Sequence, residues 1–131
     1  MRLLLDTHVL LAVAENDFGR LPHSLAEAAR EETNELFGSG ASLWETAIKH
    51  RLGKLPLPCP LEEWPTLLST LGIPLLEIRN SHILAEADPL PDTRDPFDRL
   101  LLAVCHVEQM RLLTLDRSLL SHPLAWRPRS A

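Results

Sequence analysis

Four acidic residues stand where a chain of alternating strands and helices could bring them together. Asp6 and Asp116 each follow an apolar run of the kind that forms a short buried strand, while Glu45 and Asp98 lie near the starts of predicted helices. The carboxyl ends of parallel strands meet at one edge of a sheet, which is where sites form in this class of fold. Four carboxylates at one edge would repel one another, and at least one would stay protonated unless a cation were present. Magnesium suits such a site because it takes oxygen ligands and keeps several waters.

Bound to a phosphodiester, a magnesium ion can orient water for in-line attack and stabilise the leaving oxygen. Each acid nevertheless has a structural interpretation. An aspartate after a strand often caps the next helix. Ser42-Leu43-Trp44-Glu45 fits the capping box, in which the glutamate bonds back to the helix start. For one acid alone the structural interpretation is favoured, whereas the set of four favours a site.

Asp95 and Asp98 are close neighbours for which we expect different roles. Asp95 precedes Pro96, a pair typical of a helix N-cap followed by proline at the first helical position. Asp98 lies about one turn further on, where its carboxylate could point off the helix towards Asp6. We therefore assign Asp98 to the metal and Asp95 to the cap, with the option that Asp95 also supports a ligand.

Strands and helices are predicted to alternate along the chain. The predicted strands are 2–5, 35–39, 74–78 and 111–115, and the predicted helices are 8–15, one introduced by 22–24, 42–52, 61–71, one after 80–81, and 96–109. Thr7 is expected to cap the first helix, and Gly53 and Gly72 to end the third and fourth. This alternation predicts an α/β domain with a mainly parallel sheet, and no repeat or linker divides residues 1–131.

Length, charge and cysteine content limit the classes of protein to which the chain could belong. A chain of 131 residues suits one domain. The net charge of −5 is unusual for a nucleic-acid binder, although bound cations would offset clustered carboxylates. Scarce aromatic residues argue against a stacking platform for single strands. The two cysteines are far apart in the sequence, which makes a disulfide framework unlikely. No signal peptide or membrane-spanning segment is recognised. Together with two unpaired cysteines, this indicates a cytoplasmic protein.

Four segments together resemble the motifs of PIN-domain proteins, with the closest likeness to VapC-type toxins of toxin–antitoxin pairs. The segments are Leu3-Leu4-Leu5-Asp6-Thr7-His8, Ser42-Leu43-Trp44-Glu45, Arg94-Asp95-Pro96-Phe97-Asp98-Arg99-Leu100-Leu101 and Leu113-Thr114-Leu115-Asp116. The resemblance covers nearly the whole chain and is most specific in the segment around Asp98. It implies a three-layer α/β/α fold, magnesium- or manganese-dependent cleavage of RNA, a homodimer and inhibition by a protein antitoxin. It places Asp6, Glu45, Asp98 and Asp116 at the acidic positions, with Asp116 at the most variable one.

Other polar residues could support these acids or contact RNA. The hydroxyls of Thr7 and Thr114 are candidates to hydrogen-bond the metal ligands. Lys49 and Arg51 belong to a basic cluster at the end of the third helix, which could complement the helix dipole or contact phosphate. Arg99 could contact a phosphate or pair with an acid. We interpret His8 as structural, and Trp44 and Trp64 as packing anchors rather than base-stacking platforms.

Three other functions compete with this interpretation. A phosphoacceptor receiver domain needs an adjacent acidic pair after its first strand and a late lysine. Here Thr7 and His8 follow Asp6, and no lysine lies beyond Lys54. A DNA flap nuclease would need long insertions that the chain lacks. A catalytically inert PIN-type binding module is harder to exclude, although such a module would be free to lose the four carboxylates.

Overall fold

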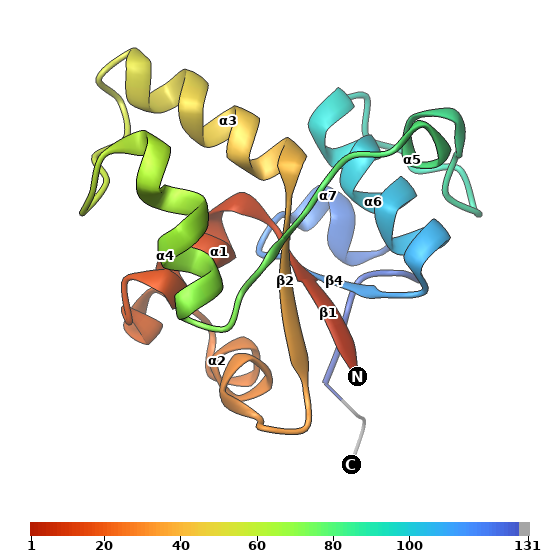
Figure 1. The fold of residues 1–131 in the computed structure, drawn as a ribbon. Coiled ribbons are helices and arrows are strands. Elements are labelled where there is room, and N and C mark those ends of the chain that lie inside the picture. Colours follow the sequence, from red (N-terminus) through yellow and green to blue (C-terminus); the bar gives the residue numbers. More distant parts are fainter. Residues whose placement is uncertain (129–131) are drawn as a thin grey trace.

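A four-stranded parallel sheet forms the centre of the computed structural model, which describes residues 1–128 (Figure 1). The strand order is β3-β2-β1-β4. Their bounds are β1 Arg2–Leu5, β2 Glu35–Ser39, β3 Leu75–Leu76 and β4 Arg111–Leu113. The register pairs Leu4 with Phe37 of β2 on one side and with Leu112 of β4 on the other. Because β1 is central and all four strands are parallel, the segments that follow β1, β2 and β4 emerge at one edge of the sheet.

Helices cover both faces of the sheet, so the fold has three α/β/α layers (Figure 1). The helices within residues 1–128 are α1 Thr7–Ala14, α2 His23–Arg30, α3 Gly40–Arg51, α4 Trp64–Thr70, α5 Asn80–Leu84, α6 Pro96–Glu108 and α7 Arg117–Leu120, with 3₁₀ turns η1 Phe18–Arg20 and η2 Leu61–Glu63. Helices α1, α2 and α4 pack on one face, and α6 and α7 pack on the other. Helix α3 continues directly from the carboxyl end of β2. No helix among these residues is long and apolar enough to cross a membrane.

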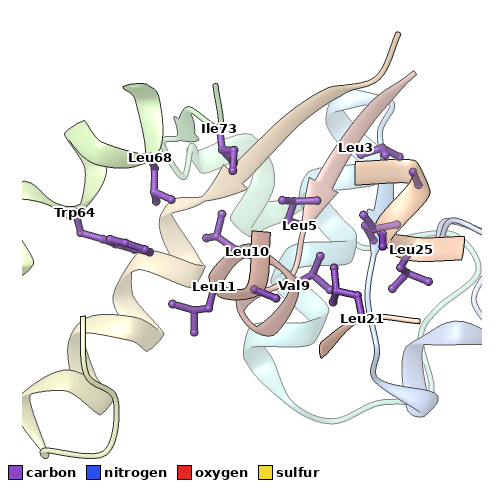
Figure 2. Close-up of a cluster of buried hydrophobic side chains, with 14 residues drawn as sticks. Leu3, Leu5, Val9, Leu10, Leu11, Leu21, Leu25, Trp64, Leu68 and Ile73 are labelled. Atoms are coloured by element: carbon purple, nitrogen blue, oxygen red, sulfur yellow. The ribbon is translucent and has the colours of Figure 1, made fainter. Parts of the chain in front are cut away.

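The core is divided by the alternation of side chains along β1. Leu3 and Leu5 point into the cluster under α1, α2 and α4 (Figure 2), whereas Leu4 points into the cluster under α6 and α7. All three are fully buried, and burial of a leucine side chain contributes about 1.5–3 kcal/mol relative to exposure. A strand buried on both faces holds the position of the residue that follows it, which here is Asp6.

Several element boundaries differ from the predicted ones. The third strand is shorter, because only Leu75–Leu76 pair with β2. β4 ends at Leu113, two residues before the predicted end. The predicted helix 61–71 is divided into η2 and α4, and α7 was not predicted. The α5 cap is Arg79 rather than Asn80 or Ser81, and its backbone N–H donates to Nδ1 of His82 at 3.0 Å.

Candidate functional site

Asp6 is a buried carboxylate with both oxygens bonded. It is the N-cap of α1, where Oδ1 accepts from the backbone N–H of Val9 at 3.0 Å. The Thr114 hydroxyl donates to Oδ2. Burial raises the pKa of Asp6 above its ordinary value, against the opposing effect of these two hydrogen bonds. The prediction that Thr7 caps α1 was therefore wrong, since Thr7 is the first residue inside the helix.

Thr114 connects the ends of β1 and β4. While it donates to Asp6, its Oγ1 also accepts from the backbone N–H of Asp116 at 3.0 Å. Because β4 ends at Leu113, Thr114 rather than Asp116 stands at the strand end. Asp116 is exposed and caps α7, with Oδ1 accepting from the backbone N–H and the hydroxyl of Ser118 at 2.9 and 2.8 Å. The Thr114 hydroxyl is thus hydrogen-bonded to the side chain of Asp6 and to the backbone of Asp116, two of the predicted site acids.

Glu45 is held by a hydroxyl and an ammonium group. The Thr7 hydroxyl donates to its Oε1 at 2.8 Å, and Lys49 Nζ donates to its Oε2 at 2.6 Å. Burial would raise the pKa of Glu45, but the hydrogen bonds from Lys49 and Thr7 outweigh it, so the pKa lies below the ordinary value. Glu45 is therefore an ionised carboxylate tied to the residue next to Asp6.

The capping-box interpretation of Glu45 was wrong. Helix α3 begins at Gly40, two residues earlier than predicted, and its cap is Ser39, whose hydroxyl accepts from Ala41 N–H at 3.0 Å. Ser42 lies inside the helix with its hydroxyl buried and without a hydrogen-bond partner in the part of the chain described. With Ser42 no longer at the helix start, Glu45 is one turn too far along α3 to close a capping box.

Asp98 is half-buried on α6 and is sensitive to the charge of the other acids. Burial raises its pKa, and the negative charges of Asp95, Asp116 and Asp6 add to this effect, giving a pKa of about 6. The Thr93 hydroxyl approaches Oδ2 at 3.4 Å and opposes the shift. The acids that raise the pKa of Asp98 are thus the caps of α6, α7 and α1, in that order of effect.

Asp95 caps α6, as the sequence predicts. Its Oδ1 accepts from the backbone N–H of Phe97 at 2.9 Å, and Pro96 occupies the first turn. The carboxylate is exposed and contributes to the repulsion felt by Asp98. A direct ligand role for Asp95 has no support in these contacts.

The candidate basic residues and His8 differ in their exposure and in their partners. Lys49 is paired with Glu45, whereas Arg51 is exposed at the end of α3. Arg99 Nε donates to the carbonyl of Thr93 at 2.7 Å, so it fixes the loop before α6. His8, interpreted above as structural, is exposed and close enough to Asp6 and Glu45 to act on both electrostatically, with burial remaining the largest influence on each.

The donor set at this edge fits a hard divalent cation. It consists of carboxylate oxygens, and the raised pKa values of Asp6 and Asp98 reflect burial and, at Asp98, repulsion that a cation would relieve. Within residues 1–128, no group of three or more His, Cys, Asp or Glu side chains is arranged as a ready ligand set. Magnesium is commonly held by one or two carboxylates together with waters and substrate phosphate, so the residues fit an ion bound partly through water.

Comparison with known proteins agrees with the fold. The chain has no significant match among curated proteins or among solved structures. The family model of the PIN domain, whose members are generally nucleases, matches residues 3–123. That match includes β2, β3 and β4, all of β1 except Arg2, α1 to α7 and the four predicted site acids. The chain therefore belongs to the PIN-domain family.

Proposed function

We propose that the protein is a metal-dependent endoribonuclease that hydrolyses RNA phosphodiester bonds with Mg²⁺ or Mn²⁺. The observation that carries the proposal is the match to the PIN domain over residues 3–123, a family whose members are generally nucleases. In addition, burial and the charges of Asp95, Asp116 and Asp6 raise the pKa of Asp98 to about 6. An uncompensated acidic environment of this kind is unfavourable for folding, and it is typical of a site that gains from binding a cation.

The proposed ligands are Asp6, Glu45, Asp98 and Asp116. Bound there, a divalent ion would supply charge neutralisation at the scissile phosphate and a polarised water. The chain's own contribution is to hold the carboxylates in place. Thr114 orients Asp6, and Thr7 orients Glu45.

Lys49 is the proposed phosphate contact nearest the acids. Its ammonium lies 2.6 Å from Glu45 Oε2, and its side chain is 39% exposed. A lysine with one partner and an accessible head can offer its remaining N–H groups to an incoming phosphate. Arg51 is a second candidate contact, further along α3. Arg99 supports this role less well, because its guanidinium bonds the loop carbonyls of Thr93 and Pro91.

The biological setting that we propose is that of a VapC-type toxin in the cytoplasm, neutralised by a protein antitoxin and active as a homodimer. The support is the resemblance of the four motif segments together with membership of the PIN-domain family. Expression of the protein alone should arrest growth, and Asp6→Asn should relieve the arrest. Growth unaffected by the parent protein would remove the toxin assignment while leaving the nuclease assignment open.

The test of the nuclease assignment is cleavage by purified protein. Total RNA and a defined tRNA panel are incubated with magnesium, with manganese and with chelator. We expect cleavage in either metal, none with chelator, and a loss of several orders of magnitude for Asp6→Asn, which removes a charge but little volume. Cleavage by Asp6→Asn at the parent rate would show that the site is misassigned. A parent protein that binds RNA without cutting it would favour an inert binding module.

A further inference from the structure

Trp44 is an exposed aromatic side chain on α3, one residue before Glu45. The sequence favoured a packing role for both Trp44 and Trp64, and Trp64 is indeed buried, with 1% of its surface exposed. Trp44 is instead 62% exposed. Its ring forms a tilted pair with the ring of Phe97, with ring centroids 5.4 Å apart and an angle of 54° between the planes.

The position of this aromatic pair relates it to the site. Trp44 directly precedes Glu45 on α3, and Phe97 directly precedes Asp98 on α6. The pair therefore bridges the two helices that carry half of the proposed ligands. Single exposed apolar residues are common and need no explanation. An exposed indole supported by a second ring next to two site acids is a more specific arrangement.

We propose that Trp44 is the stacking platform for a nucleobase next to the scissile phosphodiester, a role that requires this base to be unpaired. The inference rests on the proposed nuclease function. If phosphate lies at the carboxylates, an unpaired base attached to it would stack on the exposed part of the Trp44 ring. Stacking of a base on an aromatic ring needs no particular base, and paired bases inside an RNA helix are not free to stack on a side chain.

A second copy of the chain is a less suitable occupant of this position. The exposed apolar side chains that would suit a protein contact are grouped elsewhere, with Ile83 and Leu84 on α5 and Leu90 in the loop that follows. Trp44 lies on α3, whereas that group lies on α5 and in the loop that follows it. The aromatic count of the whole chain argued against base stacking, but it carried no information about where an aromatic side chain lies.

The test combines a change in the protein with a change in the RNA. A short single-stranded RNA with one cleavage site is prepared with a single abasic nucleotide at each position around that site. With the parent protein and magnesium, we expect one abasic position to lower kcat/KM roughly 5- to 150-fold, the range expected for loss of one base–aromatic stack. Trp44→Ala should lower kcat/KM on intact RNA by a similar factor. Removing the base at the sensitive position should then lower the kcat/KM of this variant no further. Trp44→Phe, which keeps a ring, should lose less.

Controls and a second measurement separate stacking from other roles. Leu71→Ala removes an exposed apolar side chain at the end of α4, outside the proposed site and the proposed dimer surface, and should cut intact and abasic RNA as the parent does. In the Asp6→Asn background, RNA should quench tryptophan fluorescence through Trp44, and this quenching should be lost with Trp44→Phe. Equal losses at every abasic position, or no loss for Trp44→Ala, would overturn the proposal. A third result would also overturn the proposal: Trp44→Ala leaves the effect of each abasic position unchanged and converts a dimer into a monomer. Trp44 would then be a dimer contact.

Failure of the nuclease assignment would look different from failure of the stacking proposal. If the parent does not cut RNA, or Asp6→Asn still cuts it, the nuclease site is wrong. The fluorescence measurement then decides on Trp44 independently, because it requires only binding. Quenching that survives Trp44→Phe unchanged would overturn the stacking role even when cleavage behaves as proposed.

Discussion

At the scale of single residues, Asp98 shows most clearly how the acids affect one another. Its pKa is raised to about 6 by burial and by the charges of Asp95, Asp116 and Asp6. Glu45 behaves in the opposite way, because Lys49 and Thr7 stabilise its ionised form more than burial destabilises it. The pKa values of these carboxyl groups are thus shifted in opposite directions according to their immediate surroundings.

The raised pKa of Asp98 predicts a specific pH dependence of stability without metal. Between about pH 6 and its ordinary pKa near 3.8, the folded state binds the proton more tightly than the unfolded chain. The contribution of Asp98 to stability therefore increases as the pH falls through 6. Asp98→Asn removes the repelled charge and should be more stable than the parent at pH 7.5 in chelator, with the difference shrinking towards pH 5. Urea unfolding across this range measures it.

The matched control for this measurement is Glu62→Gln, which removes an exposed acid on η2. Its stability difference from the parent should show no such change near pH 6. A difference between Asp98→Asn and the parent that stays constant with pH would show that the Asp98 carboxylate is not repelled as described.

Asp95 and Asp98 should respond differently to substitution. Asp95→Ser keeps an oxygen that can accept from Phe97 N–H, so it should lose at most about 1 kcal/mol of stability and retain substantial cleavage. Asp98→Asn should fold well and be nearly inactive. Cleavage assays and urea unfolding of both variants provide the comparison. An inactive Asp95→Ser with an active Asp98→Asn would place the ligand one helical turn earlier.

At the scale of elements, Thr114 joins the end of β1 to the turn between β4 and α7. Its hydroxyl serves both Asp6 and the Asp116 backbone N–H. The helix caps at Asp6 and Asp116 therefore depend on one side chain, in addition to the pairing of β1 with β4. The structural and functional interpretations of these acids are compatible, because capping uses one carboxylate oxygen of each.

Replacing Thr114 should test this connection. Thr114→Val keeps the shape and removes the hydroxyl, which leaves the buried Oδ2 of Asp6 without that donor. A loss of about 1–3 kcal/mol in the free energy of unfolding is expected. Thr114→Ser keeps the hydroxyl and should lose less, while retaining more cleavage activity. If urea unfolding finds Thr114→Val as stable as the parent, the hydroxyl does not hold Asp6 in solution.

At the scale of the whole molecule, the sheet edge concentrates negative charge in a protein that is already acidic, with a net charge of −5. A cation that binds the folded state alone should raise stability by mass action. We expect the melting temperature to rise with millimolar magnesium and to rise further with manganese. Asp6→Asn should reduce the shift. A melting temperature insensitive to both ions in the parent would contradict a shared metal site.

The proposed homodimer has a candidate surface on α5. Leu84 is 83% exposed and Ile83 is 63% exposed, and together with the neighbouring groove between α5 and α6 they form an apolar surface. Light scattering at tens of micromolar should find a dimer for the parent and a monomer for Ile83→Asp combined with Leu84→Asp. A monomeric parent would remove the proposed dimer, and a dimeric double variant would move the interface away from α5.

Local sequence patterns determined much of the fold and several features of the site. The α/β class with a parallel sheet, the bounds of β1 and β2, and the Asp95–Pro96 start of α6 were all predictable. These features depend on residues within a turn or a strand of one another, where periodicity, proline and capping chemistry act directly. The positions of the acids after strands and near helix starts could be read in the same way.

Contacts between distant segments decided the rest. The Thr7–Glu45 and Thr114–Asp6 hydrogen bonds join residues 38 and 108 positions apart. The α3 start at Gly40 left Ser42 inside the helix and excluded the capping box. The exposure of Trp44 depends on how α3 meets α6, which no local pattern specifies. Side-chain partners and exposure are set by packing between elements, so only the tertiary structure could identify them.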